Sequence, residues 1–362
     1  MKDSVVRRAA ASRLTARLTH PFRIALGQHD SLENVLFSLE LKDGTRGFGE
    51  AAVATHITGE TVEATMRSLE RAACELAGRD LANYLKISAE YGEKMAANPC
   101  ALAALETAMM DALTRQWRMP LWKFFGARPK TLKTDITVVL GTASESEEFA
   151  RRFYAKGLRA FKIKVGNDPE EDFERVLRVR KAAGKSALYL DANQAFDARG
   201  MLGFLRRLAQ AGCRPEVVEQ PVPKADWEGL QKVTRESGVT VLADESAGSL
   251  ADAVRIVRDR AAHGMNVKLM KFGVFRSREI ACLAKAAGLK LMIGCMMESP
   301  LAIGAAAHLA AGLGCFDTID LDTPFFLRDK VMRSPFPSPN GTYDLRTVKA
   351  GIGVVPMRSG SR

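Results

Sequence analysis

The second part of the sequence repeats a short apolar segment followed by an amphipathic helical pattern, and this repeat constrains the fold most. The apolar segments include "AFKIKV", "ALYLDAN", "EVVEQP", "TVLADE" and "MNVKLM". Polar residues that end successive segments, Lys164, Asp191, Glu219, Asp244 and Lys268, lie 27, 28, 25 and 24 residues apart. This spacing is typical of a strand–helix unit. About eight such units in a row favour a closed parallel barrel over an open doubly wound sheet.

The chain before this repeat has a different pattern. "VLFSLELKDGTRGFGEAAV" alternates apolar and polar residues around an Asp-Gly turn, which predicts a hairpin. "TVEATMRSLERAACELAG" and "ALAALETAMMDALTRQW" have helical periodicity. We therefore expect a first domain over residues 1–125 and a barrel over residues 126–322. A Pro- and Gly-rich tail, residues 323–362, is expected to pack back on the first domain.

Composition favours a folded, soluble protein over a nucleic-acid-binding or membrane protein. The formal charge is +11, but the basic residues are spread singly and in pairs over helical patterns, with no aromatic-interleaved basic stretch. No apolar run reaches the roughly 18 to 20 residues of a spanning helix, and no signal-peptide core follows the start. Six scattered cysteines suit reduced thiols. We expect a cytoplasmic location, and the sequence is compatible with both a monomer and a homo-oligomer.

Three acids end consecutive strands of the predicted barrel, and barrel active sites lie at that end. Asp191, Glu219 and Asp244 would meet there, where they repel one another unless a cation lies between them. Oxygen ligands of this kind select a hard ion such as Mg²⁺. The alternative for each acid taken alone is a helix cap. Three in succession favour a magnesium site.

Lysines flank these acids in the sequence. Lys162 and Lys164 lie two residues apart and so share one face of a strand, while Lys268 lies on the other side of a closed barrel. A lysine is a base at neutral pH only if its pKa is lowered, and like charge between Lys162 and Lys164 would do this. The alternatives are a solvated edge strand for the pair and a salt bridge for Lys268. Lys271 is expected at the surface.

The ordered motifs "KIKVG", "LDANQAF", "VEQPV", "ADES", "NVKLMK" and "IGCMMES" resemble the enolase superfamily, specifically the dipeptide epimerases of its muconate-lactonizing subgroup. "GFGEA", "ITGET" and "GIGVV" extend the resemblance over almost the whole chain. The resemblance implies an α/β fold in which an α+β capping domain covers a modified TIM barrel, (β/α)7β.

The resemblance also implies roles for residues. Asp191, Glu219 and Asp244 would bind Mg²⁺, and Lys164 and Lys268 would act as acid and base on opposite faces of the substrate's α-carbon. Lys162 would lower the pKa of its neighbour and face the substrate carboxylate. In these epimerases an Asp-x-Asp pair holds the α-ammonium of a dipeptide, and the sequence has Asp320 and Asp322 in "DTIDLDTP". Two adjacent carboxylates are natural partners of a cation; the alternatives are a capped turn and a surface acid pair.

Specificity is less determined by the sequence. Glutamate-selective epimerases carry an arginine where this chain has Gly27, so that preference is not carried over; Arg23 lies four residues earlier. "KFGV" replaces the more usual two glycines after the base strand, a change expected to affect packing alone. Thr137, Cys295, Met297 and His56 are the remaining candidate pocket residues, each with plain packing as the alternative.

These inferences predict a Mg²⁺-dependent dipeptide epimerase that moves a proton at the α-carbon of the carboxyl-terminal residue through an enediolate. A second reading is another reaction of the same subgroup: cycloisomerisation, o-succinylbenzoate synthesis or N-succinyl amino acid racemisation. A third is a binding protein that has kept the fold without activity. Asp320 and Asp322 discriminate the first two readings, because substrates of the second class carry no free ammonium.

Overall fold

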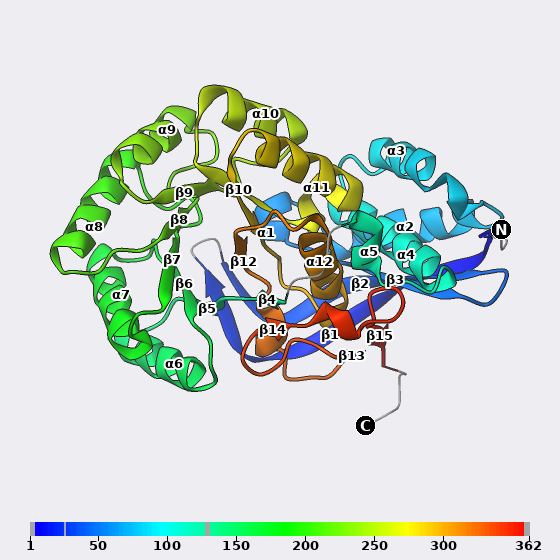
Figure 1. The fold of residues 1–362 in the computed structure, drawn as a ribbon, viewed down its shortest axis with the longest axis horizontal. Coiled ribbons are helices and arrows are strands. Elements are labelled where there is room, and N and C mark those ends of the chain that lie inside the picture. Colours follow the sequence, from blue (N-terminus) through cyan, green and yellow to red (C-terminus); the bar gives the residue numbers. More distant parts are fainter. Residues whose placement is uncertain (1–3, 25–26, 127–130, 358–362) are drawn as a thin grey trace.

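The amino-terminal part is an antiparallel sheet covered by helices (Figure 1). The computed structural model describes residues 4–24, 27–126 and 131–357. The sheet has the order β1-β2-β3 and consists of β1 (Val6–Ile24), β2 (Gly27–Leu41) and β3 (Arg46–Ala51). The predicted hairpin joins β2 to β3: Asp43 Oδ1 accepts a hydrogen bond from Thr45 N at 2.9 Å, and Gly44 has φ 84°. Glycine adopts this conformation without steric cost, which explains the Asp-Gly sequence.

Helices pack against this sheet at very short range. The helical elements of this part are α1 (Thr55–Thr58), α2 (Val62–Leu76), η1 (Leu81–Asn83), α3 (Tyr84–Lys94), α4 (Pro99–Gln116) and α5 (Leu121–Phe125). A Cβ atom at Gly47 would lie 2.1 Å from Ala108 O of α4, and one at Gly49 would lie 1.9 Å from Ala104 O. Any larger residue would push α4 away. The glycines of "GFGEA" therefore set the distance between sheet and helix.

The larger part is a barrel of parallel strands. Its strands are β5 (Ile136–Val138), β6 (Ala160–Lys164), β7 (Ala187–Asp191), β8 (Val217–Glu219), β9 (Thr240–Ala243), β10 (Gly264–Val267), β11 (Lys290–Ile293) and β12 (Thr318–Ile319). They are hydrogen-bonded in chain order, and Asp135 N donates to Ile319 O at 3.0 Å, which joins the first strand to the last.

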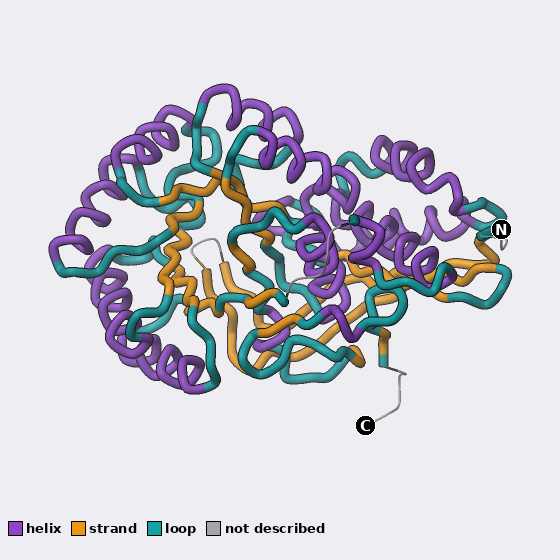
Figure 2. The backbone as a smooth tube through the Cα atoms, viewed as in Figure 1, coloured by secondary structure: helices purple, strands orange, loops and turns teal. Residues whose placement is uncertain are grey.

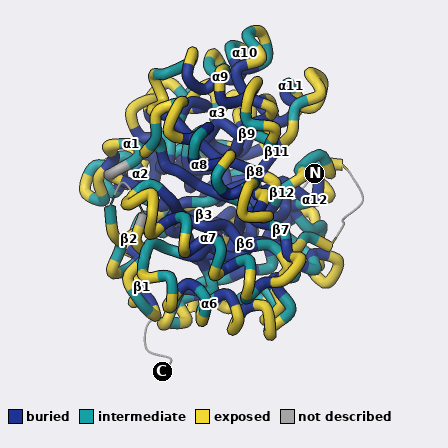
Figure 3. The backbone as a smooth tube through the Cα atoms, turned by 90° about the vertical axis from the view of Figure 1, so that its left-hand side faces the viewer, coloured by how far each residue is buried: buried dark blue, intermediate teal, exposed yellow. Residues whose placement is uncertain are grey.

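One helix follows each of the first seven strands and lies outside the sheet (Figures 1 and 2). These helices are α6 (Ala143–Ala155), α7 (Pro169–Ala183), α8 (Ala198–Gln210), α9 (Trp227–Glu236), α10 (Leu250–Asp259), α11 (Leu269–Ala286) and α12 (Pro300–Leu313). The predicted (β/α)7β barrel with an α+β cap is therefore confirmed. Its strands are buried, whereas the outer helices expose one side (Figure 3).

Inside the barrel, an apolar layer lies below a polar one. Apolar side chains on four strands pack together: Tyr189, Val217, Leu242 and Met292. Side chains two residues apart point to the same face of a strand. The acids two residues after Tyr189, Val217 and Leu242 therefore also face the interior, nearer the carboxyl ends of the strands. The parallel register pairs Lys164 with Asp191 and Asp191 with Glu219.

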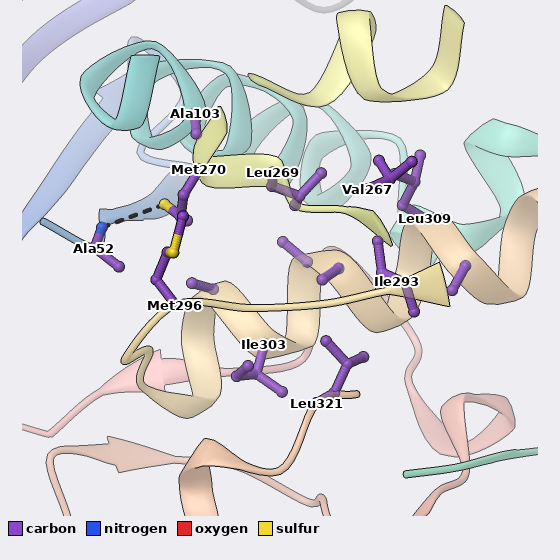
Figure 4. Close-up of a cluster of buried hydrophobic side chains, with 14 of the residues drawn as sticks. Ala52, Ala103, Val267, Leu269, Met270, Ile293, Met296, Ile303, Leu309 and Leu321 are labelled. Atoms are coloured by element: carbon purple, nitrogen blue, oxygen red, sulfur yellow. Dashed lines mark hydrogen bonds between the residues drawn. The ribbon is translucent and has the colours of Figure 1, made fainter. Parts of the chain in front are cut away.

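One apolar core runs through the cap and the barrel. At the junction, Ala52 and Ala103 of the cap lie beside Met270 of α11, and Ala52 N contacts Met270 Sδ at 3.3 Å (Figure 4). Met296, from the loop after β11, belongs to the same cluster. The cap is thus packed on the carboxyl ends of the barrel strands by apolar contact.

The tail contacts both parts. Its short elements are η2 (Thr323–Phe326), β13 (Met332–Arg333), β14 (Thr342–Tyr343), η3 (Leu345–Thr347) and β15 (Val355–Pro356); β13 pairs with β15, and β14 pairs with β4 (Leu132–Lys133). Arg115 Nη2 of α4 donates to Val354 O at 2.9 Å, and Trp122 Nε1 of α5 donates to Leu345 O at 3.2 Å. Among the described helices, none has the length and hydropathy needed to cross a bilayer.

Candidate active site

Charged side chains gather at the carboxyl ends of the barrel strands, although this region is almost closed to solvent. Lys162 and Lys164 on β6 are 3% and 7% exposed, and Lys268, which follows β10, is 5% exposed. Asp191, Glu219 and Asp244 are buried as well. The burial of Lys162 and Lys164 contradicts the alternative of a solvated edge strand. Burial of this many charges requires that they pair with one another.

The two lysines of β6 contact different acids. Lys164 Nζ lies 2.6 Å from Asp191 Oδ2 and 3.0 Å from Asn193 Oδ1. Lys162 Nζ lies 2.5 Å from Asp320 Oδ2 and 3.4 Å from the nearest carboxylate oxygens of both Glu219 and Asp191. Lys162 is thus the shared cation of three strands, and Lys164 is held at the mouth of the barrel.

The opposite wall carries Lys268, whose Nζ lies 2.7 Å from Asp244 Oδ2. Asp244 has a second cation: Lys271 Nζ donates to Asp244 Oδ1 at 2.8 Å and to the backbone oxygens of Asp244, Ala247 and Asn266. The prediction that Lys271 lies at the surface is wrong. Helix α11 begins directly after β10, so its first turn carries Lys271 back over the end of β9.

The "KFGV" segment also does more than pack. Gly273 has φ 75° and interrupts α11. Glu106 of α4 then caps the continuing helix, since its Oε2 accepts hydrogen bonds from Val274 N at 2.5 Å and Phe275 N at 3.2 Å. Ser88 Oγ donates to the other oxygen of Glu106. The segment after the base strand is therefore anchored to the cap.

The pKa directions follow from these contacts. Burial alone lowers the pKa of Lys162, but Asp320, Glu219 and nearby acids raise it well above its ordinary value. The pKa of Lys268 is raised in the same way by Asp244 and Glu219. For both Lys162 and Lys268 the carboxylates at salt-bridge distance outweigh the effect of burial, because a charge in contact has more effect than one farther away.

The three predicted metal ligands have the chemistry of a magnesium site, although among the described residues the group whose ligand atoms lie within 4.8 Å of one another is Cys295, Asp320 and Asp322. Burial, followed by the negative charge of Asp191, raises the pKa of Glu219 to about 8, and the charge of Asp244 acts in the same direction. Asp191, Glu219 and Asp244 end three neighbouring strands and offer oxygen donors only, the chemistry that Mg²⁺ prefers. A divalent cation among them would offset the repulsion. Asn266 Nδ2 donates to Glu219 Oε1 at 2.7 Å and orients that carboxylate.

The predicted ammonium-binding pair lies on the far side of Lys162. Asp320, Asp322 and Cys295 each offer an atom within 4.8 Å of the others. Asp322 Oδ2 accepts a hydrogen bond from Thr137 N at 2.6 Å, and burial and then Asp320 raise the pKa of Asp322 to about 6. Both acids are buried, which excludes a surface acid pair. The pairing of Asp320 with Lys162 was not predicted.

One pocket between cap and barrel is lined by the lysines and the acid pair, whereas the buried Asp191, Glu219 and Asp244 are not among its lining residues. Its barrel lining includes all three predicted lysines together with Thr137, Cys295, Met297, Asp320 and Asp322. Arg23 lines a neighbouring cavity beside α6, where its Nε donates to Gln28 Oε1 at 2.9 Å. His56 lies in α1, and its side chain is outside the described part of the structure.

The sequence missed the cap side of this pocket. Phe22, His29, Ala54 and Ile57 line it from the cap. Nothing in their spacing separates them from core residues, because the pocket exists only where cap and barrel meet. Asn193 was also missed, although its place in "LDANQAF" gave a signal.

A further missed group joins the cap to the pocket wall. Glu50 of β3 accepts hydrogen bonds from Ser299 N at 2.9 Å and Ala302 N at 3.3 Å, at the start of α12. Asn34 Nδ2 of β2 donates both to Glu50 Oε1 at 2.7 Å and to Met297 O at 2.8 Å. The loop that carries Met297 is therefore bonded to the cap sheet.

Comparison with known proteins places this architecture. The mandelate racemase / muconate lactonizing enzyme N-terminal domain matches residues 8–126, and the enolase C-terminal domain-like family matches residues 145–359. A hydrophobic dipeptide epimerase from Citrifermentans bemidjiense is 47% identical over 97% of this chain and 98% of its own length. An aromatic dipeptide epimerase from Herpetosiphon aurantiacus is 40% identical over 97% and 99%.

Solved structures agree with this placement. The dipeptide epimerase from Enterococcus faecalis V583, complexed with Mg and the dipeptide L-Leu-L-Tyr, has a TM-score of 0.92 and 32% identity over 97% of this chain and 99% of that chain. A substrate-liganded complex of the L-Ala-D/L-Glu epimerase from Bacillus subtilis has a TM-score of 0.94 at the same identity and coverage. The chain therefore belongs to the mandelate racemase / muconate lactonizing enzyme family of the enolase superfamily, and dipeptide epimerases are among its relatives.

Proposed function

We propose that this protein is a Mg²⁺-dependent dipeptide epimerase that inverts the α-carbon of the carboxyl-terminal residue. One observation carries the proposal: Lys164 and Lys268 line one pocket from strands four places apart in an eight-stranded barrel. Inversion of a stereocentre needs one group to take a proton from one face and another to give a proton to the opposite face. Two lysines on facing walls meet this requirement.

The chain's own groups account for the proton movement. In one direction Lys164 Nζ accepts the α-proton and Lys268 Nζ donates to the other face; in the other direction the roles exchange. Asp191 and Asp244, which contact these lysines, are two of the predicted metal ligands, so a Mg²⁺ ion that shared them would offset the negative charge that raises the pKa of Lys268. A Mg²⁺ ion held by Asp191, Glu219 and Asp244 would supply the positive charge that makes a proton beside the substrate carboxylate easier to remove. Lys162 faces the same region.

The apolar cap wall supports a preference for hydrophobic dipeptides. Phe22, Ala54 and Ile57 are apolar and lie beside His29 in the cap lining, and Met296 and Met297 continue the apolar surface on the barrel side. A charged substrate side chain would lose hydration here without gaining a partner. The relative with 47% identity is itself named for hydrophobic dipeptides.

Deuterium exchange tests the proposal directly. A library of L,L-dipeptides is incubated with the protein and Mg²⁺ in D₂O and read by mass spectrometry. We expect one deuterium at the α-carbon of the carboxyl-terminal residue, mainly in dipeptides with apolar side chains. Absence of mass gain in every dipeptide would contradict the proposed function.

Asp320 and Asp322 provide a test that distinguishes dipeptide epimerisation from the other reactions of this subgroup. Asp320 and Asp322 lie in the pocket beside Thr137. Replacing both by Asn is expected to abolish exchange into dipeptides, because the substrate ammonium loses its partners. An enzyme whose substrate lacks an ammonium would be affected only modestly. Retained turnover of an N-succinyl amino acid by the double variant would favour the racemase alternative.

We also propose the division of the chain into a cap over residues 1–125, a barrel over 126–322 and a tail over 323–362. The contacts of Arg115 with Val354 and of Trp122 with Leu345 support the expectation that the tail packs on the cap.

All six cysteines are free thiols, which supports the proposed cytoplasmic location.

A further inference from the structure

Arg175 is a buried arginine to which the proposed reaction gives no role. It lies in α7, which packs outside β6 (Figure 1), and it is 1% exposed. Its guanidinium donates to four acceptors: Nε to Ser146 Oγ at 3.2 Å, Nη1 to Lys164 O at 2.8 Å and Asp172 Oδ1 at 2.9 Å, and Nη2 to Val139 O at 2.7 Å. Asp172 neutralises the charge, so the other three bonds serve a different purpose.

Two of these acceptors are backbone oxygens of neighbouring barrel strands, at the level where the pairing of the strands stops. The parallel register of β5 and β6 runs as far as Val138 and Ile163. Val139 and Lys164 are the next residues of the two strands. Because the guanidinium bonds to both of their carbonyl oxygens, it joins the strand ends one step beyond the last paired residues. A side chain from an outer helix therefore holds the backbone of Lys164 on this side of β6.

Asp172 holds the chain where it leaves β6. Its Oδ2 accepts hydrogen bonds from Gly166 N at 2.6 Å and from Asn167 N at 3.2 Å, while its Oδ1 accepts from Arg175. Gly166 has φ 115°, a conformation that favours glycine, so the turn that Asp172 holds is a tight one. Arg175 and Asp172 lie three residues apart and share one face of α7. This face fixes both the end of β6 and the turn after it.

The effect on the reaction follows from which lysine this network supports. The side chain of Lys164 projects from backbone that Arg175 holds, whereas Lys268 follows β10 on the opposite wall of the pocket. Proton transfer depends on the placement of the base, and a displacement of about 1 Å can lower a rate about a hundredfold. Movement of the end of β6 would therefore impair one lysine and spare the other.

We propose that Arg175 is a positioning residue for Lys164, which acts through the backbone of β6 and controls proton transfer on one face of the substrate's α-carbon. The inference rests on the proposed function. A lysine at position 175 keeps the positive charge beside Asp172, but a single ammonium lacks the planar fork that reaches two carbonyl oxygens at once. Arg175→Lys thus removes the bridge between the strands and keeps the ion pair.

The test measures deuterium exchange on each face separately. The L,L and L,D epimers of one dipeptide are incubated in turn with Mg²⁺ and the protein in D₂O, and mass spectrometry gives the initial rate of α-deuterium uptake. Lys164→Ala and Lys268→Ala identify the epimer that each lysine serves. In Arg175→Lys we expect the rate for the Lys164 epimer to fall about tenfold to a hundredfold relative to the rate for the Lys268 epimer. Loss of folded protein lowers both rates and cancels in their ratio.

Arg115→Lys is the matched control. Arg115 of α4 also bonds to an aspartate, Asp111 Oδ2 at 2.8 Å, and to a backbone oxygen, Val354 O at 2.9 Å, but it lies in the cap. Its ratio of rates should equal that of the wild type. If Arg175→Lys does not fold, Ser146→Ala removes one acceptor of the guanidinium and should move the ratio in the same direction by a smaller factor.

The ratio of the two rates decides the inference. An unchanged ratio in Arg175→Lys, or in Ser146→Ala where that variant replaces it, would mean that Arg175 only stabilises the fold and would overturn the inference. A larger loss for the Lys268 epimer would overturn it as well. Absence of exchange in the wild type would contradict the proposed function instead, so the two failures are distinguishable.

Discussion

The barrel and the cap build one pocket from opposite kinds of surface. On the barrel side, Lys162, Lys164 and Lys268 each have Nζ within 2.7 Å of a carboxylate oxygen. On the cap side, Phe22 and Ile57 are apolar. Buried charges work only in a fixed arrangement, whereas an apolar wall tolerates changes of shape and volume. The chemistry is therefore expected to depend on the barrel and substrate choice on the cap.

The largest effect should come from the barrel lysines. Lys164→Ala and Lys268→Ala should each lower epimerisation by about 10² to 10⁴, the usual contribution of a positioned acid or base. Each variant should still exchange deuterium into one epimer, the one whose α-proton faces the remaining lysine. Mass spectrometry of L,L and L,D substrates measures this. Lys290→Ala, at an exposed ion pair with Asp317, is the control. Exchange into both epimers by Lys164→Ala or by Lys268→Ala would refute the two-base arrangement.

The next effect should be on metal binding. Glu219→Gln removes a charged oxygen donor, and we expect Mg²⁺ affinity to fall about a hundredfold or more in calorimetric titration. Glu216→Gln changes an exposed acid at the other end of the same strand and should leave affinity unchanged. Equal Mg²⁺ affinity in Glu219→Gln and the wild type would show that the ion is held elsewhere.

The junction between cap and barrel should depend on pH. Burial raises the pKa of Glu106 to about 7 from its ordinary value of 4.5. The folded state then keeps a proton that the unfolded state releases, so stability is lost as pH rises from 4.5 to 7, by about 3 kcal/mol. Glu106→Gln lacks this loss. We expect the free energy of unfolding of Glu106→Gln, measured by urea denaturation, to rise relative to that of the wild type as the pH increases from 4.5 to 7. A difference that stays constant over this pH range would contradict the raised pKa of Glu106.

The smallest effect should come from the cap wall. Ile57→Ala removes apolar contact, and we expect about a tenfold loss of kcat/KM for bulky hydrophobic dipeptides, with less change for small ones. Exchange chemistry on the best remaining substrate should persist. Leu85→Ala, at an exposed position of α3, serves as the control. A loss of kcat for every substrate would show that cap and barrel functions are not separable.

The same contrast explains what could be predicted from sequence. The strand repeat located Lys164, Asp191, Glu219 and Lys268, because strand ends in a barrel meet at one edge whatever the loops do. Lys271 was misplaced, since its burial depends on a helix that begins without an intervening loop. The cap lining could not be predicted, because those residues form a pocket wall only where the cap packs on the barrel.

The bonds from Glu50 to Ser299 and from Asn34 to Met297 have a consequence for how such enzymes diversify. They fix the cap to the loop that carries Met297, a lining residue of the pocket, at a point that contains none of the proposed catalytic lysines. A cap exchanged between relatives would need this glutamate and asparagine to hold the Met297 loop, together with the contacts of Glu106 and Ala52 with α11. The residues of the cap that line the pocket can therefore change during evolution while the lysines and acids of the barrel stay the same.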